Sequence, residues 1–414
     1  MTRRVFTGGQ VLDGTGSRAA PADVAVQDGR IVEVGTDLDG DESVDCTGAT
    51  LLPGLFDCHV HVMISGVDTL RHLQTPFSYP FFEAVHNLRR TVAQGITSVR
   101  DAGGADLGVA QAVRDGLVTG PRMQIAISML SQTGGHGDGW HVCGAELPLM
   151  GPHPGRPDTV VDGPDEMRRT VRQLLRAGAD VLKVATSGGV LSARDDPRHP
   201  HFRPAELDVL VEEAEAAGVA VMAHAQGADG IKSAVRAGIR SIEHGIYLDD
   251  EAIDLMLTHG TWLVPTLSAP RAVLAAVAAG ASLPEAVVAK ARAVQAVHDA
   301  SVSRAVAAGV RVAMGTDSGV GPHGDNLDEL ALMAACGMTP EQAWHATTQS
   351  AAQLLGVHTE LGTLEPGKRA DVVVLTGDPG DLAHLGARVR EVWRDGALVA
   401  VDGLVVEPGT TPPR

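Results

Sequence analysis

Two histidines separated by one residue, His59 and His61, follow a mainly apolar run that begins at Leu51. Alternate side chains of a β-strand share one face, so both imidazoles and Asp57 point the same way. Two imidazoles in this arrangement can hold one metal ion. The pair alone is a weak signal for a metal site, and it gains weight because ligand-type residues recur along the chain.

Four such residues interrupt or end later apolar segments: Lys183, His224, His244 and Asp317. A lysine inside an apolar strand is costly unless its charge is paired or removed. It either reaches the surface or carries an anionic carbamate that bridges metal ions. A lone strand-end Asp317 would be a turn former or a helix N-cap, whereas opposite a metal it can bind the ion and accept a proton from bound water. Imidazole and oxygen donors together suit zinc, with manganese, cobalt or iron as alternatives.

The segments that carry these residues alternate between strand-like and helix-like patterns. Such alternation predicts parallel βαβ units, and eight of them indicate an α/β (β/α)₈ TIM barrel with its chemistry at the C-terminal ends of the strands. A doubly wound open sheet is the alternative. Strands are predicted over 55–62, 96–100, 122–130, 180–186, 219–225, 240–244, 262–267 and 311–317. Helices are predicted over 83–94, 164–177, 204–217, 228–237, 249–259 and 284–308.

Both ends of the chain show short strand patterns separated by turns. Neither end has enough strands for a stable sheet, so residues 1–54 and 360–414 are predicted to pair into one small β-domain beside a barrel over 55–359. The Gly/Pro/His-rich segment 131–162 breaks the alternation and is predicted to be an active-site loop that roofs the barrel mouth.

Composition excludes several classes of protein. The formal net charge of −18 and the aromatic content of 3% argue against binding to nucleic acid or to anionic membranes. No apolar run reaches the roughly 20 residues needed to span a bilayer, and no secretory signal follows the N-terminal arginines. A cytoplasmic location and reduced thiols are therefore expected. The scattered cysteines are Cys46, Cys58, Cys143 and Cys336.

The order of these motifs resembles the amidohydrolase superfamily over essentially the whole chain. The matching features are the His-x-His pair, the lysine of the fourth strand, the two later histidines and the Gly-Thr-Asp-Ser run at 315–318, together with segments 53–61 and 362–371. The resemblance implies a barrel flanked by a β-sandwich made from both termini. It also implies two divalent ions bridged by a carbamylated lysine and a hydroxide. One ion would be held by His59, His61 and Asp317, the other by His224 and His244, with Lys183 between them.

Segments 98–104, 130–136 and 243–245 are most similar to the imidazolonepropionase-related branch, which contains prolidase-like Xaa-Pro dipeptidases and metallocarboxypeptidases. In that branch the histidine matching His136 lies over the metals and polarises the scissile carbonyl. Peptidase-like relatives often have tyrosine where this chain has Gln226, so dipeptide specificity stays open.

The predicted reaction is hydrolysis of an amide in a small molecule, such as a dipeptide or an N-acyl amino acid, by a metal-activated hydroxide. Asp317 and His136 are the predicted catalytic residues, and the predicted substrate contacts are His136, Gln226, Arg194 and Arg203. Arginine would grip a substrate carboxylate, whereas glutamine offers a neutral amide. The alternatives are a hydrolase of a cyclic amide, aryl amide, carbamate or urea, and a catalytically inactive structural relative. A homo-oligomer is expected.

Overall fold

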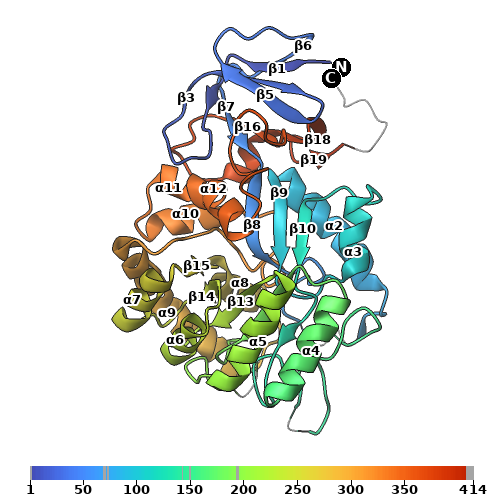
Figure 1. The fold of residues 1–414 in the computed structure, drawn as a ribbon, viewed down its shortest axis with the longest axis vertical. Coiled ribbons are helices and arrows are strands. Elements are labelled where there is room, and N and C mark those ends of the chain that lie inside the picture. Colours follow the sequence, from blue (N-terminus) through green and yellow to red (C-terminus); the bar gives the residue numbers. More distant parts are fainter. Residues whose placement is uncertain are drawn as a thin grey trace.

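The computed structural model describes residues 2–68, 71, 74–141, 143–148, 151–192 and 195–406. An α/β part forms one end of the molecule, and sheets built from the two ends of the chain form the other (Figure 1). Three parallel strands form one sheet of the α/β part: β8 (Leu55–Val60), β9 (Ile96–Asp101) and β10 (Arg122–Ile125). Five form the next: β11 (Met129–Leu130), β12 (Val181–Ala185), β13 (Ala220–Ala225), β14 (Ser241–His244) and β15 (Trp262–Val264).

Every strand of these two sheets pairs with its neighbour in sequence, without a crossover that reverses the order. A doubly wound sheet has such a reversal, so the alternative architecture is excluded. Each strand is followed by helical or loop segments that return the chain to the same end. The C-terminal ends of the strands therefore lie together, which is the arrangement that the ligand-type residues require.

The strand predicted over 122–130 is wrong as a single element. Ile127 has a φ of +66°, a left-handed conformation that interrupts the extended chain between β10 and β11. β10 pairs with β9, and β11 pairs with β12. The break therefore transfers the pairing from one neighbouring strand to the next.

Residues 311–317 are also not a regular strand, contrary to the prediction, although they lie where a strand was expected. The backbone amide of Ala313 donates to the carbonyl of Leu263 in β15 at 3.0 Å. On the other side, the amide of Asp317 donates to the carbonyl of His59 in β8 at 2.7 Å. These bonds hold the segment between β15 and β8 and bring Asp317 beside His59.

All six predicted helices are confirmed, with ends shifted by a few residues, and five further helices appear in the part of the chain that the structure describes. One of these further helices, α8 (Ser268–Ala278), was not predicted because it is rich in Ala and Val and shows no clear polar face in its sequence. The predicted set is α2 (Tyr79–Ala93), α4 (Pro164–Arg176), α5 (Pro204–Ala217), α6 (Ala228–Arg236), α7 (Asp250–His259) and α9 (Glu285–Ala308). The additional set is α3 (Leu107–Arg114), α8 (Ser268–Ala278), α10 (Asp328–Ala335), α11 (Pro340–Ala346) and α12 (Gln349–Leu354). No helix in the described ranges is long and apolar enough to cross a bilayer.

The terminal strands form a four-stranded sheet, β5-β4-β1-β6, and a seven-stranded sheet, β19-β18-β17-β16-β7-β2-β3. In the second sheet β7 pairs antiparallel with β16, which joins the two ends of the chain. The N-terminal strands are β1 (Arg4–Thr7), β2 (Gln10–Val11), β3 (Ala20–Pro21), β4 (Asp23–Gln27), β5 (Arg30–Gly35), β6 (Glu42–Asp45) and β7 (Ala49–Pro53). The C-terminal strands are β16 (Val372–Thr376), β17 (Val389–Arg394), β18 (Ala397–Val401) and β19 (Leu404–Val405).

Apolar side chains from both terminal sheets share one core. Phe6 of β1 packs edge-on against Trp393 of β17, with ring centroids 5.3 Å apart, and Val24, Leu51 and Val372 belong to the same cluster. The two ends of the chain thus stabilise each other by burying a common apolar face. The division of the chain at 54/55 and 359/360 stays a prediction.

Candidate metal centre

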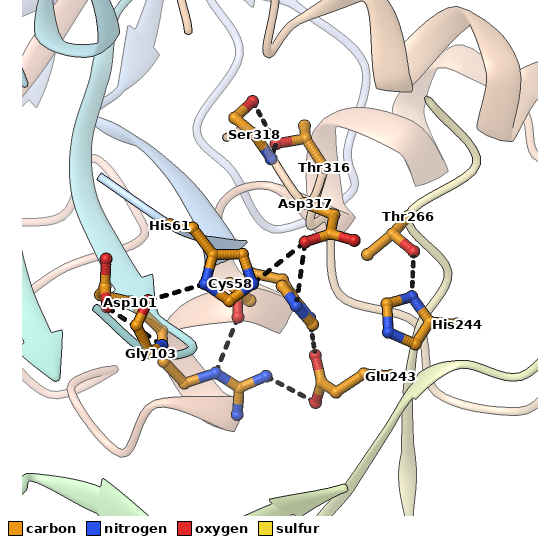
Figure 2. Close-up of polar contacts among 12 residues, drawn as sticks. Cys58, His61, Asp101, Gly103, Glu243, His244, Thr266, Thr316, Asp317 and Ser318 are labelled. Carbon is orange, nitrogen blue, oxygen red and sulfur yellow. Dashed lines mark hydrogen bonds and ion pairs between the residues drawn. The ribbon is translucent and has the colours of Figure 1, made fainter. Parts of the chain in front are cut away.

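Three buried side chains at strand ends bring possible metal-ligand atoms together. One ligand atom each from His59, His244 and Asp317 lies within 4.8 Å of the others. His59 comes from β8, His244 ends β14, and Asp317 ends the segment between β15 and β8. His61 lies beside His59, and His224 lies beside His244. Figure 2 shows His61, Asp317 and His244 at this site. All five side chains and Lys183 line one cavity of about 290 Å³.

The outer ring nitrogens of the first two histidines are held by acceptors. His59 Nδ1 donates to Glu243 Oε2 at 2.8 Å, and His61 Nδ1 donates to the carbonyl of Gly103 at 2.7 Å. Their Nε2 atoms then face Asp317, at 3.4 Å and 3.2 Å from its Oδ1. Metal-binding histidines are oriented in this way by partners on the other nitrogen. Burial and the nearby Lys183 also lower the pKa of His59 well below its usual value, which favours the neutral imidazole that binds metals.

Backbone geometry explains why two adjacent residues of β14 both reach the site. His244 has a φ of +72°, so the alternation of the strand ends there and its ring lies beside His59 while Glu243 already faces inward. Thr266 and Asp317 also have positive φ, at +50° and +61°. Thr266 Oγ1 lies 2.7 Å from His244 Nδ1. Uncommon backbone conformations of non-glycine residues often gather at functional sites, where surrounding contacts hold them.

Lys183 in β12 is 2% exposed, and its Nζ has no hydrogen-bond partner in the described part of the chain. Burial lowers its pKa to about 8, although the carboxylates of Glu243 and Asp317 act in the opposite direction. An unpartnered buried ammonium is costly. A carbamate on this nitrogen, with cations beside it, would remove that cost. Together with the carboxylate and the oriented imidazoles, the residues present fit a centre for divalent ions.

Sequence reasoning missed the charged pair beneath the histidines. Glu243 accepts from His59, from Arg100 Nη2 at 2.9 Å and from Ser241 Oγ at 2.6 Å. The carboxylate of Asp101, the neighbour of Arg100 in β9, accepts from backbone amides instead. Both Arg100 and Glu243 are charged residues within buried strands. The signal that singled out Lys183 could therefore have found them.

His136 and His224 lie against each other at the cavity wall. Their rings stack with centroids 4.2 Å apart, and His136 Nδ1 lies 2.9 Å from Ser192 Oγ. His224 Nε2 donates to the carbonyl of Gly188 at 3.1 Å. With Nε2 used in this way, Nδ1 is the ring nitrogen that could bind an ion. The role of His224 as a ligand stays a prediction.

The predicted substrate contacts divide into those inside and those outside the cavity. Gln226 is buried and lines it, and its Oε1 has no hydrogen-bond partner among the residues described. Arg203 is exposed at the start of α5, where its amide donates to Glu206, and it does not line the cavity. Arg194 lies outside the described residues. No arginine occurs among the described lining residues, so they offer no guanidinium for a substrate carboxylate.

The remaining walls of the cavity are formed by the predicted roof segment and by helices. From the roof, residues 136–141 line the cavity, and the Trp140 side chain is half exposed. From α9, His298 lines the cavity and its Nε2 donates to the carbonyl of His244 at 2.8 Å. Nothing in the sequence distinguished this histidine, because it lies within a long helix.

Comparisons with known proteins agree with this geometry. Residues 50–406 match the model of the Amidohydrolase family. Ochratoxinase of Aspergillus niger is 34% identical over 424 aligned residues, covering 97% of this chain and 87% of the relative. A crystal structure of a Xaa-Pro dipeptidase with methionine in its active site has a TM-score of 0.87 at 33% identity, covering 96% of this chain and 99% of the other.

A prolidase crystallised with N-methylphosphonate-L-proline has a TM-score of 0.88 at 36% identity, covering 97% of this chain and 100% of the other. These neighbours imply a fold of the (β/α)₈ TIM-barrel type. The family match and the buried cluster of histidines and aspartate also support metal binding. The chain therefore belongs to the amidohydrolase family and is a hydrolase that acts on C–N bonds.

Proposed function

We propose that this protein hydrolyses an amide bond of a small molecule, such as a dipeptide or an N-acyl amino acid, with the help of two divalent ions. The observation that carries the proposal is the set of oriented, buried ligand atoms at the floor of one cavity. The proposed ligands are His59, His61, Lys183 as its carbamate, His224, His244 and Asp317, and the proposed metal is zinc. The similarity to dipeptidase and prolidase structures supports an amide substrate.

Divalent ions bound here would lower the pKa of a water molecule from 15.7 to roughly 7, which supplies a nucleophile at neutral pH. Asp317 accepts the proton of the attacking water and returns it to the leaving amine. His136, held through Nδ1 by Ser192, presents its other nitrogen to the substrate carbonyl and stabilises the charge that develops on oxygen. The roof residues over the cavity restrict contact with bulk water.

A second candidate is a neutral aryl amide, cyclic amide, carbamate or urea. The lining of the cavity favours it, because the described residues there include Gln226 and no arginine.

A substrate panel tests the proposal and separates the two candidates. Zinc-loaded protein is expected to hydrolyse N-acyl amino acids or dipeptides, and removal of the metal with a chelator should abolish the reaction. Each substrate is assayed with a free and with an amidated C-terminus. Faster cleavage of the free acids favours the first candidate, and equal rates favour the second. A zinc-loaded, folded protein that cleaves no amide, carbamate or urea in the panel would contradict the proposed function.

A further inference from the structure

One side of the cavity is apolar and is built by α8, α9 and three loops that follow barrel strands. Six of its side chains are buried and belong to one apolar cluster: Val67, Val190, Ile246, Val273, Val287 and Val294. The same cavity reaches the histidines and Asp317. We call the part of the cavity that these six residues enclose, together with the residues themselves, the apolar arm.

The apolar arm is held in place by polar contacts at its edges. Lys290 of α9 donates through Nζ to the carbonyls of Gly189 at 2.7 Å and Ser192 at 2.5 Å. Further along the same helix, His298 donates to the carbonyl of His244. Helix α9 is therefore tied both to the loop after β12 and to a proposed metal ligand. These contacts fix the walls of the arm relative to the site of hydrolysis.

The charged residues that line the cavity lie elsewhere. The polar lining residues Ser192 and His298, which share a loop and a helix with residues of the arm, bond to the backbone carbonyls of Gly189 and His244. Lys183 and Asp317 lie at the floor, and Asp138 belongs to the roof segment, whereas the six residues that define the arm are all aliphatic. An aliphatic pocket beside a polar centre gains binding free energy by removing an apolar group from water. It offers a charged or strongly polar group no partner.

We propose that the apolar arm is a specificity site that binds a bulky aliphatic or aromatic group attached to the scissile amide. The inference rests on the proposed function, because it assigns one substituent of the bond that is cleaved. The group can belong to the acyl side or to the amine side of that bond. Substrates with only small substituents, such as acetylglycine, leave the arm without an apolar partner and are poor substrates.

Binding of straight-chain alkyl hydroxamic acids tests the arm separately from catalysis. The hydroxamate anchors on the metal-loaded centre, and the chain is lengthened from two to eight carbons while affinity is measured by calorimetry. Affinity is expected to rise about fourfold for each methylene that enters the arm. Val294→Trp, which fills the arm, should remove this gain. Val297→Trp is the matched control, because Val297 lies on the same helix and is 37% exposed.

A smaller substitution guards against a tryptophan variant that does not fold. Val294→Ala enlarges the arm and should extend the gain to longer chains. The inference is overturned if affinity is independent of chain length in the unmodified protein, or if folded, metal-loaded Val294→Trp keeps the same gain.

Two substrate series then show which side of the amide enters the arm. One series varies the acyl group of N-acylglycines, and the other varies the side chain of N-acetyl amino acids. At least one series should show kcat/KM rising with apolar size, and this rise should be lost in Val294→Trp. If neither series shows the rise although the amides are cleaved, the inference is wrong. If the protein cleaves no amide but its affinity for hydroxamic acids still rises with chain length, the apolar arm is a binding site and the proposed function is wrong.

Discussion

Asp317→Asn should lower kcat by about 10³-fold, within the range typical of a lost general acid or base. Burial alone would raise the pKa of Asp317, but the nearby imidazoles of His59 and His61, the second of which donates a hydrogen bond to the carboxylate, lower it well below its usual range. Asp317 is therefore an ionised carboxylate at neutral pH and can accept a proton from water. Asparagine has nearly the same shape, yet its amide oxygen is a weaker base and a weaker metal ligand.

Steady-state kinetics and metal analysis of the same sample check this expectation. Asp325→Asn, an exposed aspartate in the following loop, is the control and should leave kcat unchanged. Unaltered kcat in the Asp317 variant would exclude a role in proton transfer. Loss of every bound ion together with activity would show that Asp317 acts first as a ligand.

Lys183→Ala should remove most of the bound metal and reduce activity to near the detection limit. The physical reason is that its buried Nζ, without a hydrogen-bond partner in the described chain, can bridge two ions only as an anionic carbamate. The folded state should not be weakened in the metal-free form, because the substitution removes an unpaired buried amine. Short carboxylic acids such as formate or acetate should restore part of the activity by replacing the missing anion.

Metal analysis measures the loss of bound ions, and assays with and without added formate measure the activity and its rescue. Thermal unfolding of the metal-free proteins compares their stability. Lys232→Ala is the control, since that lysine pairs with Asp249 and Glu251 near the surface of α6 and should affect neither metal nor activity. A Lys183 variant that binds two ions as tightly as the unmodified protein would contradict the bridging role.

The sequence was most informative where a short pattern reports a local property. The His-x-His pair and the strand-end histidines could be placed because strand alternation and βαβ order depend on neighbouring residues. The same reasoning placed Asp317 near His59, although residues 311–317 do not form a regular strand. Asp317 lies near His59 because its segment is held between β15 and β8, whether or not that segment is a regular strand.

Features that depend on contacts across the fold could not be predicted. The left-handed conformation of Ile127 is one that a β-branched residue disfavours, and a histidine such as His244 adopts it only in a minority of cases, so the residue types did not indicate either conformation. Two partners of Glu243, His59 of β8 and Arg100 of β9, lie 184 and 143 residues away from it in the sequence. The choice of Arg203 as a substrate contact rested on its place after a strand, and the structure shows that this arginine is exposed at a helix start.

Titration of the metal-stripped protein with zinc, followed at once by ion analysis and by amide hydrolysis, tests the metal-dependent site most directly. Hydrolysis should be absent in the stripped protein, rise with bound zinc and saturate close to two ions per chain. A double variant, His59→Ala with His244→Ala, should bind little zinc and remain inactive at every concentration. Full hydrolysis by the metal-free protein, or equal zinc binding and activity in the double variant, would contradict a metal centre at these residues.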